Sequence, residues 1–163
     1  MNAVFYNWYD SPVGRLLLAG SPSGLSFVSF SRGKHAVPVR ADWIEDRKAF
    51  TSVIEQLEEY FVGKRRRFEL VLRPQGSQFQ LAVWTELQSI SYGETISYTD
   101  LAQRIGKPKA VRAVGAANGA NPIPIIIPCH RVIGSNGSLT GFGGGLPIKK
   151  RLLELESRQL TLV

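Results

Sequence analysis

Three short stretches near the start of the chain alternate between apolar and polar residues, and turn sequences rich in Ser, Pro and Gly separate them. Alternation with a period of two is typical of half-buried β-strands, and Pro and Gly favour the turns between antiparallel strands. The sequence therefore predicts a β-meander with strands at Val4–Tyr9, Arg15–Ala19 and Leu25–Phe30. The polar stretch Ser31–Lys48 is expected to form a long surface loop.

A helix and one further strand are predicted after this loop. Apolar residues recur at helical spacing on one face of Ala49–Phe61, and Gly63 supplies the end of that helix. Phe68–Leu72 has the composition of a strand. The densest charge run of the chain is Lys64–Arg67, and a solvated loop outside the sheet accounts for it better than a DNA contact does.

The pattern becomes helical from Ser77 onward. Ser77 and Gln80 have the spacing of a capping box, in which each side chain binds the other residue's backbone N–H. Because Arg73–Gly76 is a turn-forming sequence just ahead of this helix, it marks the predicted boundary between two domains. These domains are 1–76 and 77–163.

Two short helices joined by a glycine-containing turn follow, which is the pattern of a helix-turn-helix. The first begins at Ser97 and ends at Gly106, and the second spans Ala110–Asn118. The outward face of the second helix carries one arginine among residues with almost no side chain, namely Arg112, Gly115, Ala116 and Gly119. A solvated helix normally presents Lys, Glu or Gln, and Gly lowers helix stability. This bare face is therefore suited to close packing, either with another helix of the protein or with another backbone.

The only cysteine of the chain, Cys129, follows an apolar run that contains three prolines. Proline prevents helical hydrogen bonding, so residues 122–128 are predicted to form a buried extended segment. His130 and Arg131 come directly after the thiol, where an imidazole and a guanidinium would favour the nucleophilic thiolate. A lone cysteine is more often a small buried hydrophobe, but these neighbours favour a reactive nucleophile.

A last helix is predicted at Pro147–Ser157, with an apolar stripe of Ile148, Leu152 and Leu155. Glu156 lies at the edge of this stripe near the helix C-terminus, where the helix dipole disfavours a carboxylate. From its position alone, Glu156 either has a specific partner or reaches water from a frayed helix end.

Composition narrows the possible functions. A chain of 163 residues with 44% hydrophobic and 20% charged residues can bury the core of one domain or of two small ones. No run is apolar enough to span a membrane, and the N-terminus lacks the pattern of a signal peptide, so a cytoplasmic protein with no membrane partner is expected. One cysteine and two histidines exclude an internal disulfide and argue against a metal site. The net charge of +7 favours binding to a polyanion.

The string Pro128–Val132, with Asn121–Pro122 upstream and Gly143–Gly145 downstream, closely resembles the O6-alkylguanine-DNA alkyltransferases in their single-protein bacterial form. The resemblance covers Ser77–Glu156, whereas the first half agrees with the family only in length and in the order of its elements. The resemblance implies an α+β fold. An N-terminal, strand-rich, ribonuclease-H-like domain would brace a C-terminal, winged-helix-like helical domain that contains the helix-turn-helix.

The resemblance also implies a function, which is direct reversal of DNA alkylation. The alkyl group would pass irreversibly from O6-alkylguanine, and from O4-alkylthymine, to the protein's own cysteine in one turnover without a cofactor. The implied partner is double-stranded DNA carrying alkylated guanine, bound through its minor groove by a monomer. Two other classes stay open: a module that flags alkylated bases without repairing them, and a cysteine hydrolase. The flagging relatives lack the cysteine, and a hydrolase leaves the bare-faced helix unexplained.

Matching positions imply a role for each site residue. Cys129 would be the nucleophile, His130 would act on it through a bridging water, and Glu156 would orient His130. Tyr98 would donate a hydrogen bond to the guanine ring nitrogen, and the side chain of Asn121 would hold the active-site segment.

The remaining implied contacts involve the DNA and the flipped base. Arg112 would fill the gap left by the flipped nucleotide while its helix enters the minor groove. Further implied contacts are the small groove-facing residues Gly115, Ala116 and Gly119, the pocket walls Asn118, Pro124 and Phe142, the carbonyls of Cys129 and Val132, and the amide of Gly143. Relatives usually carry tyrosine at the position of Phe142, so only a ring wall is expected there.

Overall fold

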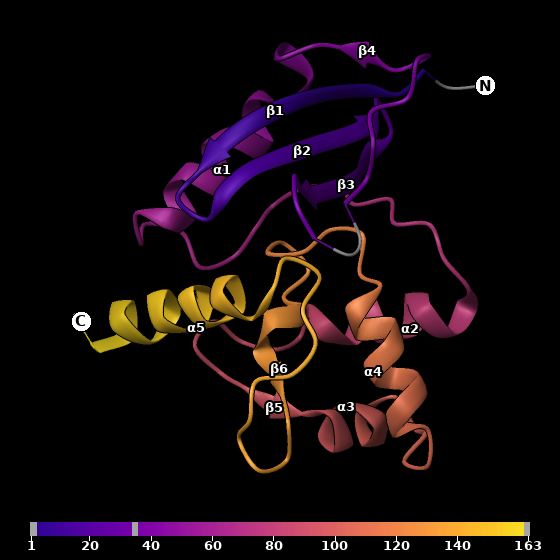
Figure 1. Cartoon of the computed structure of the whole chain (residues 1–163), viewed down its shortest axis with the longest axis vertical. Coiled ribbons are helices and arrows are strands. Elements are labelled where there is room, and N and C mark those ends of the chain that lie inside the picture. The colour runs from indigo at the N-terminus through magenta and orange to yellow at the C-terminus, as the bar shows by residue number, and fades with distance from the viewer. Residues whose placement is uncertain (1–2, 34–35, 162–163) are drawn as a thin grey trace.

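The structure, a computed structural model, describes residues 3–33 and 36–161 and places a β-sheet above a group of helices (Figure 1). The predicted meander is confirmed: β1 (Phe5–Ser11), β2 (Gly14–Ser21) and β3 (Gly24–Phe30) are antiparallel neighbours. A two-residue strand, β4 (Ile44–Glu45), pairs in parallel with β1 and completes the order β3-β2-β1-β4.

Helix α1 (Thr51–Phe61) lies along one face of this sheet (Figure 1). Leu57 and Tyr60 of α1 are fully buried in the same core as Leu18 and Val28 of the sheet. The predicted start of this helix is two residues early, because the three residues 48–50 form a 3₁₀ turn instead.

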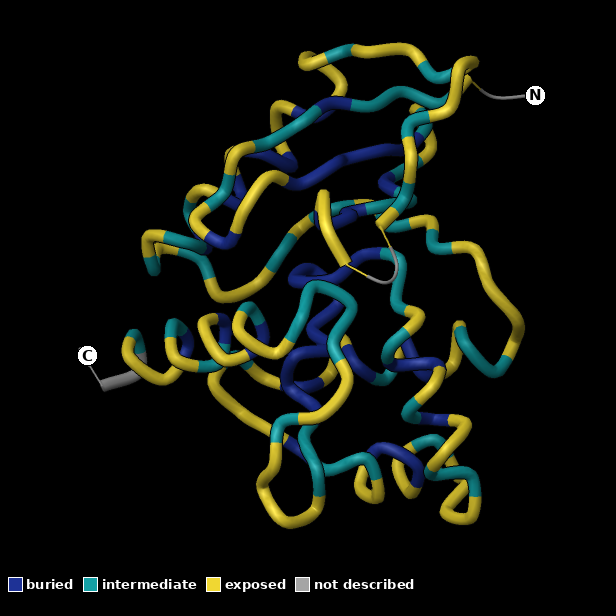
Figure 2. Tube along the Cα trace, viewed as in Figure 1, coloured by how far each residue is buried: buried dark blue, intermediate teal, exposed yellow. Residues whose placement is uncertain are grey.

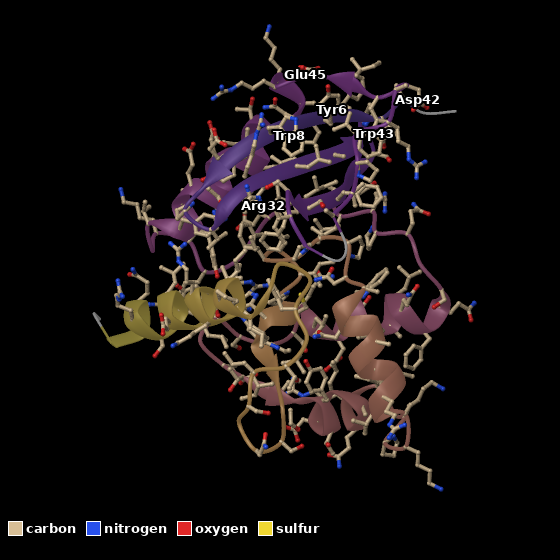
Figure 3. All side chains as sticks on the ribbon, in the orientation of Figure 1. Tyr6, Trp8, Arg32, Asp42, Trp43 and Glu45 are labelled. Atoms are coloured by element: carbon tan, nitrogen blue, oxygen red, sulfur yellow. The ribbon has the colours of Figure 1, made fainter. Side chains whose placement is uncertain are left out.

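The expected surface loop between β3 and α1 also contributes to packing. Residues 34 and 35 of that loop lie outside the described part, and β4 lies near its end. Trp43 packs against Tyr6 and Phe27, with ring centroids 6.4 and 6.2 Å apart (Figure 3). The loop therefore places an aromatic cover over part of the sheet, which its polar composition did not indicate.

The prediction of a strand at Phe68–Leu72 is wrong. Only Leu72 forms a bridge, in parallel with Leu25, through hydrogen bonds that join the backbone of Leu25 to Val71 and Arg73. The side chain of Gln56 accepts a hydrogen bond from the N–H of Glu69 at 2.8 Å and donates one to the C=O of Glu69 at 3.2 Å. The segment therefore touches the sheet at one point and has no continuous strand partner.

The second half contains four helices and a small parallel sheet of two strands, among the residues that the structure describes. Capping boxes at Ser77 and Ser97 begin the first two helices, as predicted for Ser77. The elements are α2 (Gln78–Leu87), β5 (Ile96–Ser97), α3 (Tyr98–Arg104), α4 (Val111–Gly119), β6 (Val132–Ile133) and α5 (Leu146–Thr161). Helices α3 and α4 form the predicted helix-turn-helix. An N-terminal sheet followed by C-terminal helices confirms the expected α+β fold. The division of the chain at Gly76 stays a prediction.

The segment that precedes Cys129 is buried as predicted, and it lies between the two halves (Figure 2). It is not extended. The N–H of Ile127 donates to the carbonyl of Ile123 at 2.9 Å, and Ile125 has a φ of 74°. A positive φ strains a β-branched residue, so the surrounding structure must impose this turn. The side chain of Asn121 does so by binding the N–H of Ile123 and the carbonyl of Ile127.

None of the described helices combines the length and apolar character needed to cross a membrane.

Candidate active site

Cys129 lies at the start of a short 3₁₀ helix, η2 (Cys129–Arg131), and is 5% exposed. A cavity of about 150 Å³ reaches it. From the second half of the chain the cavity wall includes five residues for which the sequence predicted a role, namely Gly119, Asn121, Pro124, Phe142 and Gly143. From the first half, β3 contributes Phe30, whose ring meets that of Phe142 edge-on with centroids 5.5 Å apart. Both halves of the chain therefore form the cavity.

The thiol is neutral at rest, which corrects the sequence-based expectation of a favoured thiolate. Burial raises the pKa of Cys129 to about 11, against smaller opposing contributions from the Asn121 side chain and the Lys149 charge. The neighbouring His130 and Arg131 do not lower it, since both side chains bind Glu156 instead. Activation of the thiol therefore requires removal of its proton during the reaction.

We expect Cys129 to react very slowly with iodoacetamide at neutral pH. A pKa of about 11 leaves about one thiol in 10,000 ionised at pH 7, and the thiolate is the reactive form. The rate of modification of the folded protein, followed by intact mass, should rise about tenfold per pH unit from pH 7 to 9. Protein unfolded in urea serves as the control and should react as an ordinary thiol. A rate in the folded protein that levels off below pH 8 would contradict a raised pKa.

Glu156 is the centre of a buried hydrogen-bonded cluster. It is 1% exposed, and α5 continues past it to Thr161, so it is not a frayed terminal carboxylate. His130 Nε2 lies 2.7 Å from Oε2, and Arg131 binds both carboxylate oxygens, with Nε at 2.9 Å and Nη2 at 3.0 Å. The Tyr60 hydroxyl donates to Oε2 at 2.7 Å, and the N–H of Gly93 donates to Oε1 at 3.2 Å.

The charges in this cluster determine the tautomer of His130. Burial acts to raise the pKa of Glu156, but hydrogen bonds and charges from His130 and Arg131 outweigh it and hold the pKa far below its usual range. Burial lowers the pKa of His130, and the neighbouring Glu156 offsets this only in part. A neutral imidazole facing a carboxylate must donate through Nε2, which leaves Nδ1 as an acceptor. Nδ1 is buried and has no hydrogen-bond partner within the described part of the chain, so it can accept a proton.

A second buried cation was missed by sequence reasoning. Lys149 is fully buried, and its Nζ donates to the carbonyls of Val132 and Thr140 at 2.6 and 2.8 Å. Burial lowers its pKa to about 8. Tyr98 donates to the same Thr140 carbonyl at 2.9 Å, so Lys149 binds the Val132 carbonyl directly and shares an acceptor with Tyr98. The resemblance implied a base contact for each of these two groups. The spacing in the sequence could have indicated Lys149, because it is seven residues before Glu156 and therefore lies on the same face of the helix.

Tyr60 was also missed, and no local pattern could have indicated it. It is 96 residues from Glu156 in the sequence and belongs to a helix whose apolar spacing accounts for its burial. Asn118, expected to be a pocket wall, is not among the residues that line the cavity. It is 2% exposed, and its side chain donates to the carbonyl of Cys129 at 3.3 Å.

The outward face of α4 is open in the structure. Arg112 and Ala116 are exposed, a Cβ added at Gly119 would meet no atom within 4 Å, and one at Gly115 would meet only Tyr98 at 3.8 Å. The inward residues are fixed, since Trp84 Nε1 donates to the carbonyl of Ala117 at 2.8 Å. Within the described residues, the face around Arg112, Ala116 and Gly119 therefore does not pack against another helix, whereas Gly115 lies beside Tyr98 of α3.

Together these features define an α+β protein in which a helix-turn-helix lies beside a buried cysteine and a histidine–glutamate pair. Residues 4–74 match the family model described as "6-O-methylguanine DNA methyltransferase, ribonuclease-like domain", and residues 78–158 match its "DNA binding domain". The chain belongs to this family, the O6-alkylguanine-DNA alkyltransferases.

Individual relatives match over nearly their whole length. The methylated-DNA–protein-cysteine methyltransferase of Methanosarcina barkeri is 52% identical over 157 residues, which are 96% of this chain and 99% of that protein. That of Mycobacterium tuberculosis strain H37Rv is 48% identical over 153 residues, which are 94% of this chain and 92% of that protein. The crystal structure of Mycobacterium tuberculosis OGT in complex with DNA has a TM-score of 0.90 and 47% identity, and covers 95% of this chain and 94% of that one.

Proposed function

We propose that this protein repairs DNA by transferring the alkyl group of O6-alkylguanine to Sγ of Cys129. The observation that carries the proposal is a buried thiol in a cavity wall, followed in the chain by a neutral histidine whose Nδ1 has no partner among the described residues. The Cys129–His130–Glu156 order of nucleophile, base and orienting carboxylate is a general arrangement for activating a nucleophile. Residues 1–76 would brace this site, and residues 77–163 would carry it.

The transfer is an in-line displacement. Sγ of Cys129 forms a bond to the alkyl carbon while the bond from that carbon to guanine O6 breaks, and its electron pair stays on the guanine. The thiol proton passes through a bridging water to Nδ1 of His130, and the Glu156 carboxylate stabilises the imidazolium that results. Because the thioether formed is not hydrolysed under mild conditions, each molecule acts once. O4-alkylthymine presents an alkyl carbon on an exocyclic oxygen in the same way.

The leaving guanine needs hydrogen bonds, because its anion is a poor leaving group. The Tyr98 hydroxyl, which donates to the Thr140 carbonyl in the free protein, would donate to the guanine ring nitrogen instead. The amide of Gly143 in the cavity wall would donate near O6, and the carbonyls of Cys129 and Val132 would accept from the guanine amine. The Val132 carbonyl is already held by Lys149, which would fix its direction.

The alkylated base can reach Cys129 only outside the duplex, since the thiol lies in a narrow buried cavity. The protein would bind double-stranded DNA as a monomer. The open face of α4, with Gly115, Ala116 and Gly119, would approach the minor groove. Arg112 on that face would occupy the gap left by the flipped nucleotide. The net charge of +7 supports binding to the phosphate backbone.

Intact-mass measurement tests this function. After incubation with an oligonucleotide that contains O6-methylguanine, the protein should gain one methylene unit permanently and stoichiometrically, at Cys129. A protein that binds the oligonucleotide without gaining mass would be a flagging module. Multiple turnover without an adduct would indicate a hydrolase.

The Arg112→Ala variant should repair duplex DNA more slowly and react normally with free O6-benzylguanine, if that base enters the cavity. Unstacking a base costs a few kcal/mol, so losing the residue that fills the gap should slow duplex repair about tenfold or more. Single-turnover rates on both substrates measure this. The control is Lys109→Ala, which removes an exposed charge from the turn just before α4. Equal slowing on both substrates would mean that Arg112 supports the fold and has no role in base flipping.

A further inference from the structure

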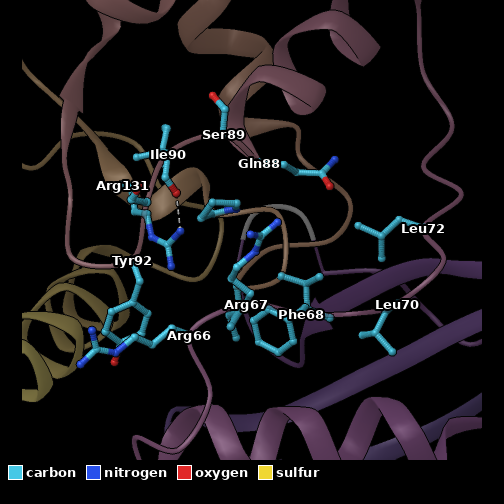
Figure 4. A pocket seen from close by; sticks show the side chains of 14 residues that line it. Arg66, Arg67, Phe68, Leu70, Leu72, Gln88, Ser89, Ile90, Tyr92 and Arg131 are labelled. Carbon is cyan, nitrogen blue, oxygen red and sulfur yellow. Dashed lines mark hydrogen bonds between the residues drawn. The ribbon is translucent and has the colours of Figure 1, made fainter.

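A second cleft, of about 580 Å³, lies between residues 66–72 and the end of α2 (Figure 4). Residues 66–72 belong to the segment that joins the two halves of the chain, called the joining segment below. Phe68, Leu70 and Leu72 line one side, and Gln88 and Ile90 line the other. No residue lines both this cleft and the cavity that reaches Cys129. The cleft is therefore separate from the cavity that reaches Cys129, although Arg131 belongs both to its wall and to the Glu156 cluster. Its volume is within the range of ligand sites.

Phe68–Leu72 is not a strand, but it presents an edge of unpaired backbone groups beside this cleft. On the sheet side, Gln56 binds the N–H and C=O of Glu69, and Leu25 binds the C=O of Val71 and the N–H of Arg73. Successive residues of an extended segment direct their backbone groups to opposite sides, so the next set points away from the sheet. Within the described part of the chain, the backbone N–H and C=O groups of Phe68, Leu70 and Leu72 have no hydrogen bond. Such an edge is a template for another strand.

The charge of the cleft has one sign. Three of its lining residues are the arginines Arg66, Arg67 and Arg131, and none is acidic. Arg66 and Arg67 are exposed and have no ion-pair partner among the described residues, whereas Arg131 is held by Glu156. The Arg66 guanidinium lies over the Tyr92 ring, 5.4 Å from its centroid, and has no acidic partner within the described part of the chain. The cleft thus combines an apolar wall, unpaired backbone donors and acceptors, and two cations without an acidic partner at the same end of the segment.

We propose that this cleft is a docking site for an extended, acidic segment of a partner protein. The segment adds as a strand along Phe68–Leu72, its alternate apolar side chains pack on Leu70 and Leu72, and its acidic residues meet Arg66 and Arg67. Main-chain hydrogen bonds supply affinity and the side-chain pockets supply specificity in this mode of recognition. A nucleic acid strand fits less well, because it would leave the apolar wall and the strand edge unused.

Docking here leaves the repair surfaces free. The cleft contains no residue of α4 and none of the cavity that reaches Cys129, so a partner can bind while the protein is on DNA. Its far wall contains Ile126 and Pro128, which precede Cys129 directly in the chain.

Selection from a displayed library of random twelve-residue peptides on the full-length protein tests this proposal. Enriched peptides should alternate apolar residues and carry acidic residues at one end. As synthetic fluorescent peptides, they should lose at least tenfold in affinity towards the double variant Arg66→Glu/Arg67→Glu. The matched control, Lys107→Glu/Lys109→Glu, makes the same charge change on another exposed surface and should bind them normally. Both variants should still react with free O6-benzylguanine at the wild-type rate, which shows that they are folded.

Backbone methylation of the peptide distinguishes strand addition from simple charge attraction. Methylating alternate peptide nitrogens should abolish binding in one register and leave it unchanged in the other, because only every second N–H faces the edge. Three results would overturn the proposal: no enriched acidic peptide, equal loss of affinity in both double variants, or no dependence on the methylated register. Displacement of the peptide by undamaged duplex DNA would assign the two arginines to nucleic acid binding and would overturn it as well.

Discussion

Methyl transfer from an O6-methylguanine oligonucleotide is expected to stop when Cys129 is replaced by serine. A serine hydroxyl is a far weaker acid than a thiol whose pKa is about 11, so His130 cannot remove its proton in step with attack. DNA binding should be almost unchanged, because the side chain is 5% exposed and the replacement is nearly isosteric.

Intact mass after incubation with the oligonucleotide measures transfer in this variant, and fluorescence anisotropy with the same duplex measures binding. The melting temperature should stay close to that of the wild type, which separates lost chemistry from lost folding. Methyl transfer near the wild-type rate would contradict the assignment of Cys129 as the nucleophile.

The Glu156→Gln variant should lose both stability and transfer rate. The amide can no longer neutralise the Arg131 guanidinium, which is buried and bonded to both oxygens of the native carboxylate. Leaving one partner of a buried ion pair uncompensated costs about 3–5 kcal/mol of unfolding free energy. Transfer should slow because a neutral amide stabilises the His130 imidazolium less. A solvent-exposed Glu156, which its position near the helix end allowed, would have predicted no loss of stability.

Denaturant unfolding across pH checks the stability part. The folded-state pKa of Glu156 lies below its unfolded value, so its contribution is fully present above the unfolded pKa of about 4.3 and is lost as pH falls towards the folded pKa. The difference in unfolding free energy between wild type and variant should therefore be constant from pH 6 to 8 and should shrink below about pH 4. A difference that stays constant down to pH 3 would contradict the ion pair.

Tyr60→Phe is the matched control for this variant. It removes a neutral donor from the same Oε2 atom and keeps the charge of Glu156, so it should cost about 1.5–3 kcal/mol, less than the loss of the charge. The single-turnover rate of methyl transfer, measured on the same preparations, should then decrease from wild type to Tyr60→Phe and further to Glu156→Gln. If the two variants transferred equally fast, the charge of Glu156 would have no part in activating Cys129.

The contact between Tyr60 and Glu156 also shows what the first half of the chain does. Tyr60 reaches the histidine–glutamate pair from α1, and Phe30 of β3 closes the cavity against Phe142. The strand-rich half is therefore part of the site as well as a brace, and changes in its core should alter the transfer rate.

The sequence by itself determined the elements whose causes are local. Alternating apolar residues specified the meander, the side chain at Ser77 specified the start of α2, and Gly106 separated the two short helices. It also singled out Cys129 and the bare face of α4, since a lone thiol between Pro128 and His130 and glycines on a helix surface are visible without coordinates.

Only the tertiary structure decided the features that depend on distant partners. Burial between the two halves raised the pKa of Cys129, reversing the effect expected from its sequence neighbours, and the Asn121 side chain turned a segment that its prolines suggested was extended. Glu156 gained its hydrogen bond to Tyr60 across 96 positions of the chain. The physical reason is that hydrogen-bond geometry and desolvation depend on which groups meet in space, and residue spacing records only which neighbours share a face.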